Sequence, residues 1–446
     1  MKYFSSIFFL MLVVSFGQSE VYAQIGTRFP SERILIKDPV TGNQLIFLTS
    51  KPVGDRKIYQ THNQWTADGK WIIFTSGRVK GEALAVNEKS GEIVQVTEGG
   101  FAGMLNVSGK SMKLYFIRNL DERKLTKGII EVDLQQIFTD SKAGKMKPAN
   151  VYQRICGVIP EEFDASGDMA LDATEEWAWF RTGKEIARKY LPENVKTEPN
   201  FGPRNMGEGP GGIAGMNLKT GETKYVVSVP FQIGHIQSNP WVAGQIVFCW
   251  ETGGKAPQRT WIVNSDGSGL RPLYPESSFE WVTHEAVISP DEVGIAILGH
   301  RKIKTELDTM NFEGTDPSGA NPGQDAGWGN CGTREKPTGF GIVNINTREM
   351  TIAGQTLSGS GFWHVGGSSD KRFAVGDDFA RNIYLINRKT HEMILLSAGH
   401  KSSANDHPHP TFKADGTKIV IQSAMLSTDN RSMNICVIPV PRKWLK

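Results

Sequence analysis

The stretch HPHPTFKADGTKIVIQS, residues 407–423, contains two histidines one residue apart, each followed by a proline. The alternating apolar residues after its Asp-Gly turn predict a β-strand, and side chains two apart in an extended chain point the same way. His407 and His409 can therefore approach a single ion. Imidazole suits zinc, manganese, iron or nickel, so a third histidine from elsewhere in the chain would make an ordinary divalent metal site.

Four other histidines open segments of the same design. The segments are HNQWTADGKWIIFTS from His62, HIQSNPWVAGQIVFCW from His235, HEAVISPDEVGIAIL from His284 and HVGGSSDKRFAVGDD from His364. In each, a turn follows the histidine and an alternating apolar strand follows the turn. The turn is acidic in all but the His235 copy. Two weaker copies, near Met104 and Met169, lack the histidine, which brings the number of copies to seven.

The elements that must position these histidines are short strands. Downstream of the copies, segments such as NEKSGEIVQVTEG and NRKTHEMILLSAG read as strand, polar turn and strand, so each unit contains about four strands. Helical periodicity is nearly absent. Seven such units predict an all-β fold, a seven-bladed β-propeller that forms a single domain over residues 24–446. The Gly-rich stretch at 309–339 is expected to be an insertion between units five and six.

The two ends of the chain are predicted to close the ring. After the last histidine copy the chain has only enough residues for three strands, whereas ILIKDPVTGNQLIFLTS near the N-terminus is an isolated outer-strand element. We therefore expect the strand around residues 45–48 to complete the last blade by pairing with the strand that contains Cys436. Such closure leaves only short, protected sheet edges.

A propeller would bring the histidines to one face of the ring, because every blade repeats the same chain direction. For any single histidine a structural role is the more ordinary interpretation, as in propellers whose blades carry Gly-His and Trp-Asp signatures. The Trp-Asp partner is missing here, and the doubled His-Pro exceeds what the start of a strand needs. The cluster as a whole therefore favours a site.

Residues 1–23 have the pattern of a secretory signal peptide, with cleavage near Ala23. The apolar core of this segment is about 15 residues, shorter than the roughly 20 that span a membrane, so we expect an exported, periplasmic or secreted protein. The net charge of +3 gives no case for nucleic acid or for an anionic membrane as a partner. The four cysteines (Cys156, Cys249, Cys331 and Cys436) form no C-x-x-C pattern.

Three stretches resemble oligogalacturonate lyases, the seven-bladed enzymes that cleave short pectic uronides. They are FCWETGGKAPQRTWIVNSDGSGLRPLY, WVTHEAVISPDE and NDHPHPTFKADGTKIVIQSA, and the resemblance runs loosely from the first blade to the end of the chain. It implies that a divalent ion, manganese above all, is held by His284, His407 and His409. It also implies that His235 is the catalytic base.

The chain departs from the family pattern at two positions. Where the family has a glutamine as fourth metal ligand this chain has Ala404, which leaves Asn405 as the nearest amide. The family arginine upstream of the base is replaced in the stretch GPGGIAGMN. Arg204 lies near that gap, and Arg259 matches another family arginine.

This set of residues suits a metal-assisted β-elimination of a uronide, which removes the C5 proton beside a carboxylate and expels the oxygen on C4. A cation stabilises the developing charge, a neutral histidine accepts the proton, and an arginine can bind the carboxylate. The candidate substrate-binding residues are His62, Gln237, Glu251 and His364. Two alternatives stay open: a non-catalytic binding propeller of the cell envelope, and a metal-dependent glycoside hydrolase in which the ion activates water. An ordinary glycosidase needs a pair of carboxylates, and Glu251 and Glu285 are both expected near the site.

Overall fold

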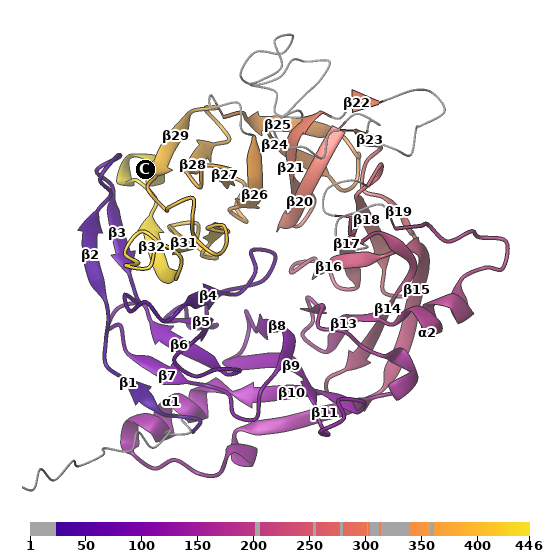
Figure 1. Cartoon of the computed structure of the whole chain (residues 1–446), viewed down its shortest axis with the longest axis horizontal. Coiled ribbons are helices and arrows are strands. Elements are labelled where there is room, and N and C mark those ends of the chain that lie inside the picture. The colour runs from indigo at the N-terminus through magenta and orange to yellow at the C-terminus, as the bar shows by residue number, and fades with distance from the viewer. Residues whose placement is uncertain are drawn as a thin grey trace, which may run out of the picture.

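Seven sheets of four or five strands surround a central channel in the computed structural model of the chain (Figure 1). The structure describes residues 24–200, 206–252, 256–276, 280–300, 302–303, 312–313, 339–356 and 361–446. The expected seven-bladed propeller is therefore confirmed. The proposed signal peptide, Arg204 and Cys331 lie outside the described residues. Within those residues, no helix combines the length and the apolar character needed to cross a membrane.

The first three blades contain one additional N-terminal strand and most of the helical residues. The first blade consists of β1 (Arg28–Phe29), β4 (Asp55–Lys57), β5 (Trp71–Ser76), β6 (Ala83–Asn87) and β7 (Ile93–Gln95). The second consists of β8 (Ala102–Val107), β9 (Lys113–Asn119), β10 (Lys127–Asp133) and β11 (Gln153–Ile159). The third consists of β12 (Met169–Leu171), β13 (Trp177–Thr182), β14 (Glu208–Asn217) and β15 (Thr223–Phe231). Helices connect several of these strands. The helix α1 (Leu134–Ala143) and the 3-10 turn η1 (Ala149–Val151) lie between β10 and β11, the 3-10 turn η2 (Glu161–Phe163) lies between β11 and β12, and α2 (Lys184–Tyr190) lies between β13 and β14.

The remaining four blades follow the same antiparallel order from the channel outwards. The fourth is β16 (Ile233–Ser238), β17 (Gln245–Trp250), β18 (Thr260–Asn264) and β19 (Arg271–Pro272), and the fifth is β20 (Glu280–Ser289), β21 (Glu292–His300), β24 (Gly339–Asn344) and β25 (Met350–Gly354). The sixth is β26 (Phe362–Gly367), β27 (Phe373–Asp378), β28 (Ile383–Asn387) and β29 (Met393–Ser397). The seventh combines β2 (Ile34–Lys37) and β3 (Gln44–Phe47) with β30 (Thr411–Phe412), β31 (Lys418–Ser423) and β32 (Asn434–Pro439). A short C-terminal helix, α4 (Arg442–Leu445), follows.

The core lies between neighbouring blades. Ile73 of the first blade and Phe116 of the second share one buried cluster, and Leu385 of the sixth blade and Ile421 of the seventh share another. Because each blade packs against a neighbour on both faces, its middle strands are buried on both sides, as in the fully buried stretch FAVGDD of β27. The propeller is thus a rigid frame for side chains that point into the channel.

The predicted closure of the seventh blade is present. Ile46 and Phe47 pair with Val437 and Cys436, so the N-terminal strand β3 lies next to the C-terminal strand β32. In Figure 1 the indigo strands β2 and β3 lie beside the yellow strands β31 and β32. Phe47 and Cys436 are both completely buried, which ties the two ends of the described chain together.

One expectation about the blades was wrong. The Gly-rich stretch at 309–339 was expected between units five and six, but β21 and β24 on either side of it pair with each other in the fifth blade. The insertion therefore lies within that blade. The strands after it, β24 and β25, are the two outer strands of the fifth blade. Most of the insertion is outside the described residues. Its described strand β23 (Phe312–Glu313) forms a two-stranded ladder with β22 (Lys302–Ile303), which precedes the insertion.

Candidate metal and catalytic site

Irregularities in the innermost strands project the histidines into the channel. The pairing register shifts between Gly234 and Gln237, between Val282 and Glu285, and between Phe362 and His364. Such bulges turn a side chain away from the regular alternation of a strand and are common beside active sites. The backbone of His235 also has a positive φ of 50° and that of His409 a φ of 52°, which is an uncommon conformation for residues other than glycine.

Four of these histidines form one cluster around His364. The ring centroid of His364 lies 4.3 Å from that of His284, 3.8 Å from that of His409 and 5.4 Å from that of His407. The four rings come from the fifth, sixth and seventh blades. The structure therefore brings together the three histidines that the sequence indicated as metal ligands, and it places His364, a predicted substrate-binding residue, at their centre.

A carboxylate that the sequence analysis missed completes this cluster. Asp377 of β27 is fully buried, with Oδ1 3.1 Å from Nδ1 of His364 and Oδ2 3.6 Å from Nδ1 of His407. Although burial works against ionisation, the contacts with His364 and His407 hold the pKa of Asp377 well below its usual range. The ligand atoms of His364, Asp377 and His407 all lie within 4.8 Å of one another. An ionised carboxylate among imidazoles is a donor set suited to a divalent cation.

The protonation states of the histidines also fit a cation. Burial, together with the neighbouring imidazoles, lowers the pKa of His364 to about 3 and that of His284 well below its usual value. Neutral imidazole is the form that coordinates a metal. In the described part of the chain, moreover, Nδ1 of His284 and Nδ1 of His407 are buried and have no hydrogen-bond partner. A buried nitrogen without a partner is costly, and a bound ion would satisfy both atoms.

A second group of possible ligands is less suited to an ion. His235, Cys249 and Glu251 also lie within 4.8 Å of one another. The guanidinium of Arg259 lies 3.8 Å from Glu251, and this buried positive charge disfavours a cation at the same place. We therefore assign the metal to the cluster around His364 and Asp377.

His235 has the surroundings of a general base. Its Nδ1 lies 2.8 Å from Oε1 of Glu285, which only accepts, and 3.2 Å from Nη2 of Arg259, which only donates. The shorter contact, with Glu285, places the ring proton on Nδ1. The lone pair is then on Nε2, which lies 3.4 Å from Glu251. Burial lowers the pKa of His235, but the negative charge and hydrogen bond of Glu285 outweigh it, so that the pKa is raised overall. The ring centroid of His235 lies 5.8 Å from that of His284, so the base adjoins the metal cluster.

Of two other predicted site residues, Arg259 contacts the base directly, with Nη2 3.2 Å from Nδ1 of His235, and Gln237 contacts the backbone of the fifth blade. Arg259 is 1% exposed, and its Nε donates to Oε2 of Glu285 at 2.8 Å. It therefore fixes the carboxylate that holds His235. The amide of Gln237 donates to the carbonyl of Glu285 at 3.1 Å and accepts from the backbone N–H of Val287 at 3.0 Å. These bonds join the fourth blade to the fifth and leave the substrate role of Gln237 a prediction.

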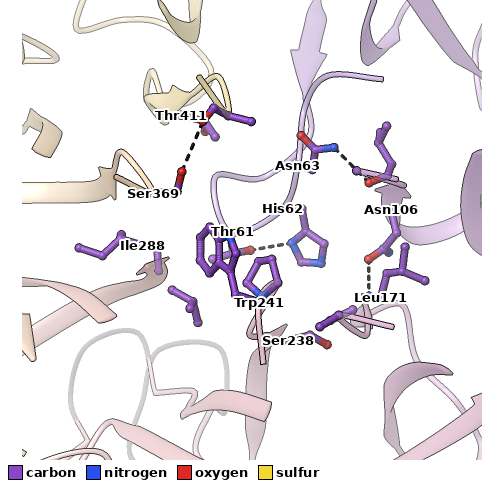
Figure 2. Close-up of a pocket in the computed structure, with 18 of the residues that line it drawn as sticks. Thr61, His62, Asn63, Asn106, Leu171, Ser238, Trp241, Ile288, Ser369 and Thr411 are labelled. Carbon is purple, nitrogen blue, oxygen red and sulfur yellow. Dashed lines mark hydrogen bonds between the residues drawn. The ribbon is translucent and has the colours of Figure 1, made fainter. Parts of the chain in front are cut away.

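Two cavities lie on opposite sides of the loop at residues 58–63. A cavity of about 800 Å³ opens beside Tyr59, Asp406 and His409, and the exposed residue Asn405, the proposed fourth ligand, lines it too. A cavity of about 420 Å³ lies at the other ends of the innermost strands (Figure 2). His62 and Trp241 line this smaller cavity, and Nε2 of His62 lies 2.8 Å from the carbonyl oxygen of Met169. His62 is therefore apart from the other site histidines, because the chain of the first blade leaves the strand direction after β4.

Tyr59 was not indicated by the sequence. It precedes His62 by three residues, and its ring centroid lies 5.2 Å from that of His235 and 5.0 Å from that of His409. Burial, reinforced by Glu285, raises the pKa of the Tyr59 phenol well above its usual value. The phenol is thus a neutral group between the base and the metal cluster.

Two known proteins are similar to this chain over most of its length. The chain is 22% identical over 420 residues to an oligogalacturonate lyase of Dickeya dadantii, a match that covers 87% of this chain and 92% of the relative. It is 21% identical over 434 residues to an oligogalacturonide lyase of Pectobacterium atrosepticum, which covers 89% and 94% of the two chains. No family model matches the chain. The resemblance to this family therefore extends along nearly the whole chain.

Solved structures show the same fold. An oligogalacturonate lyase in complex with manganese superposes with a TM-score of 0.69 at 16% identity, covering 95% of this chain and all of that one. An oligogalacturonate lyase from Vibrio parahaemolyticus superposes with a TM-score of 0.67, also at 16% identity, covering 94% of this chain and all of that one. The overall fold of this chain is thus similar to that of both solved structures.

Proposed function

We propose that this chain, which resembles oligogalacturonate lyases along most of its length, is a metal-dependent lyase that cleaves uronate-containing oligosaccharides by β-elimination. One observation carries the proposal: His235, fixed by Glu285, adjoins a cluster of four imidazoles and one buried carboxylate, with the rings of His235 and His284 5.8 Å apart. Elimination beside a carboxylate needs this combination of a base and a cation site. Pectic oligogalacturonides are our first choice of substrate because the relatives of similar sequence are lyases of that class.

The proposed metal ligands are His284, His407 and His409, with Asp377 as the buried carboxylate beside them. Manganese is the first choice, since a structural neighbour is described in complex with it, and zinc, iron or nickel are alternatives for the same donors. When bound, the ion supplies positive charge that stabilises the enolate-like charge developing on the substrate carboxylate. The cavity of about 800 Å³ beside His409 gives an oligosaccharide access to this cluster.

The residues of the chain then account for the proton transfer. His235 takes the C5 proton on Nε2, because its other nitrogen is held by Glu285. The imidazolium that forms lies between two carboxylates, at 2.8 Å from Glu285 and 3.4 Å from Glu251, and both stabilise its charge. Arg259 keeps Glu285 in place. Burial of the whole group strengthens these electrostatic interactions relative to water.

The alternatives explain the site less well. A glycoside hydrolase needs a carboxylic acid that can give its proton to the leaving oxygen. Glu285 is fully buried and already engaged by both His235 and Arg259, so it is a supporting group rather than a free acid. A binding propeller without catalysis has no need for a cluster of neutral imidazoles around a buried aspartate.

The proposal is tested with a chelator and with two histidine variants. Removal of metal should abolish formation of unsaturated product from oligogalacturonides, and Mn²⁺ should restore it. His235→Ala should lose about 10²-fold or more in rate, as expected for a missing general base, while it still binds manganese. His391→Ala, a change at an exposed histidine, is the matched control and should behave as wild type. Full activity in the presence of chelator would contradict the proposal.

We also propose that the protein is exported, with residues 1–23 removed as a signal peptide. The apolar segment ending in VYA before Gln24 supports this proposal. N-terminal sequencing of the protein from its natural host should find a mature chain that begins near Gln24. A cytoplasmic protein with an intact N-terminus would contradict export.

A further inference from the structure

The loop after β4 places a tyrosine in the middle of the proposed site. The ring centroid of Tyr59 lies 5.2 Å from that of His235, 5.0 Å from that of His409 and 6.1 Å from that of His364. The first of these histidines is the proposed base, and the other two belong to the metal cluster. Tyr59 also lines the cavity of about 800 Å³ through which we expect the substrate to enter. A sugar bound to both parts of the site would therefore contact Tyr59.

Hydrogen bonds on both sides of Tyr59 hold the loop in this position. Before it, Nζ of Lys57 donates to the carbonyl of Ile58 at 2.8 Å and to the hydroxyl of Thr411, in the seventh blade, at 3.0 Å. After it, Nε2 of His62 reaches the carbonyl of Met169, in the third blade, at 2.8 Å. The loop is thus fastened to two blades besides its own.

The side-chain amide of Gln64 holds the backbone of the loop by two hydrogen bonds. Nε2 of Gln64 donates to the carbonyl of Tyr59 at 3.1 Å and to that of His62 at 2.7 Å. Nδ1 of His62 lies 2.7 Å from the hydroxyl of Thr61, as Figure 2 also shows. The backbone at Tyr59 is therefore fixed, while the Tyr59 hydroxyl has no hydrogen-bond partner among the described residues. A fixed phenol with a free O–H is a donor prepared for a ligand.

The elimination requires such a donor. When the C4–O bond breaks, the leaving sugar oxygen carries negative charge until it receives a proton. His235 is occupied with the C5 proton, and Glu285 is engaged by Arg259 and His235. The Cys249 thiol is completely buried, lies 3.8 Å from Glu251 and does not line the cavity. A phenol keeps its proton at neutral pH, so it can act as an acid without a preceding change of state.

We propose that Tyr59 is the general acid that protonates the leaving oxygen on C4. This inference rests on the proposed lyase function. In one turnover His235 takes the C5 proton, the C5–H electron pair forms the C4–C5 double bond, and the C4–O bond breaks towards oxygen. That oxygen takes the phenol proton. The resulting phenolate recovers a proton from the imidazolium of His235, whose ring centroid is 5.2 Å away, so both residues return to their starting states.

A change of leaving group tests this role. Tyr59→Phe should lose on the order of 10²-fold in kcat on trigalacturonate, with little change in KM, because only the transition state needs the proton. On a galacturonide that carries fluorine in place of the C4 oxygen, the leaving fluoride needs no proton, and the same variant should release it at nearly the wild-type rate. The phenylalanine variant should fold and bind Mn²⁺ as wild type does, since the hydroxyl has no partner to lose. Tyr190→Phe, at an exposed tyrosine of α2, is the matched control.

The outcomes separate this inference from the function on which it rests. An equal loss on both substrates would show that Tyr59 only positions its neighbours, and no loss on either would show that it is not needed; both results overturn the acid role while the lyase function stands. If the metal-loaded wild type forms no double bond from either substrate, the proposed function itself fails.

Discussion

The carboxylate of Glu285 lies 2.8 Å from Nδ1 of His235 and, through its other oxygen, 2.8 Å from Nε of Arg259. This single side chain thus fixes the tautomer of the proposed base, supplies negative charge for its protonated form, and neutralises a buried guanidinium. Burial alone would lower the pKa of His235, and Glu285 is the largest influence that raises it. Because the base must be neutral to act, activity should rise with pH through this raised pKa.

Replacing the charge of Glu285 should therefore move the pH profile. In Glu285→Gln the pKa of His235 falls, and the acid limb of kcat/KM moves to lower pH. The rate at neutral pH should drop by about 10- to 100-fold, the equivalent of one charge-assisted hydrogen bond. Steady-state rates across the pH range check this prediction. Glu222→Gln, at an exposed glutamate, is the control. An unchanged acid limb in Glu285→Gln would show that Glu285 does not raise the pKa of the catalytic base.

Metal content distinguishes the candidate ligands. His407→Ala should lose most of its manganese, because the replaced ring supplies a buried nitrogen without another partner. Asp377→Asn should weaken binding as well, since it removes the one buried carboxylate of the cluster. Asn405→Ala, at an exposed position, should retain the metal. Elemental analysis of the purified variants measures the manganese bound per chain. A full complement of manganese in His407→Ala would rule out this site.

Repetition explains why so much of the fold could be predicted from the sequence. A copy of the repeat occurs in each of the seven blades, with its histidine in five of them. The isolated N-terminal strand was expected to pair with the strand around Cys436, and the pairing of Phe47 with Cys436 bears this out. The boundary of the fifth blade was misplaced because a long insertion separates β21 from β24, although they are neighbours in the sheet.

The site was predicted where it followed the repeat and missed where it did not. His284, His364 and His409 share a register, His407 lies two residues before it, and the four rings meet in the channel. Asp377 is on the second strand of its blade, and the only sign of it in the sequence is an acidic pair at the end of the apolar stretch FAVGDD. Tyr59 and His62 belong to a loop that breaks the register of the first blade. The repeat gave no indication of Tyr59, and it misplaced His62, which lies beside the smaller cavity.

Ring closure should contribute strongly to stability. Phe47→Ala removes a completely buried ring from the strand that pairs with β32, and should cost about 3 to 5 kcal/mol of unfolding free energy. Ile34→Ala, in the outer strand β2 where the side chain is 38% exposed, should cost far less. Urea unfolding of both variants measures the difference. Equal, small losses would show that the N-terminal strands do not lock the propeller.

Lys57, which fastens the Tyr59 loop, makes stability depend on pH. Burial lowers the pKa of this lysine to about 7, although Asp406 and Asp377 oppose the shift. In the unfolded chain the amine keeps its proton up to a pKa of about 10.4, so between these values the unfolded state binds more protons and stability should rise with pH. Lys57→Met should show a smaller rise. Urea unfolding at several pH values compares the two slopes, and identical slopes would contradict a buried, neutral amine.

The nature of the product tests the central claim most directly. If His235 removes the C5 proton beside the metal cluster, wild-type protein loaded with Mn²⁺ must convert oligogalacturonides to products with a C4–C5 double bond conjugated to the carboxylate. Near-ultraviolet absorbance should then rise in step with the appearance of new reducing ends. New reducing ends without any gain in absorbance would show hydrolysis and contradict the lyase account.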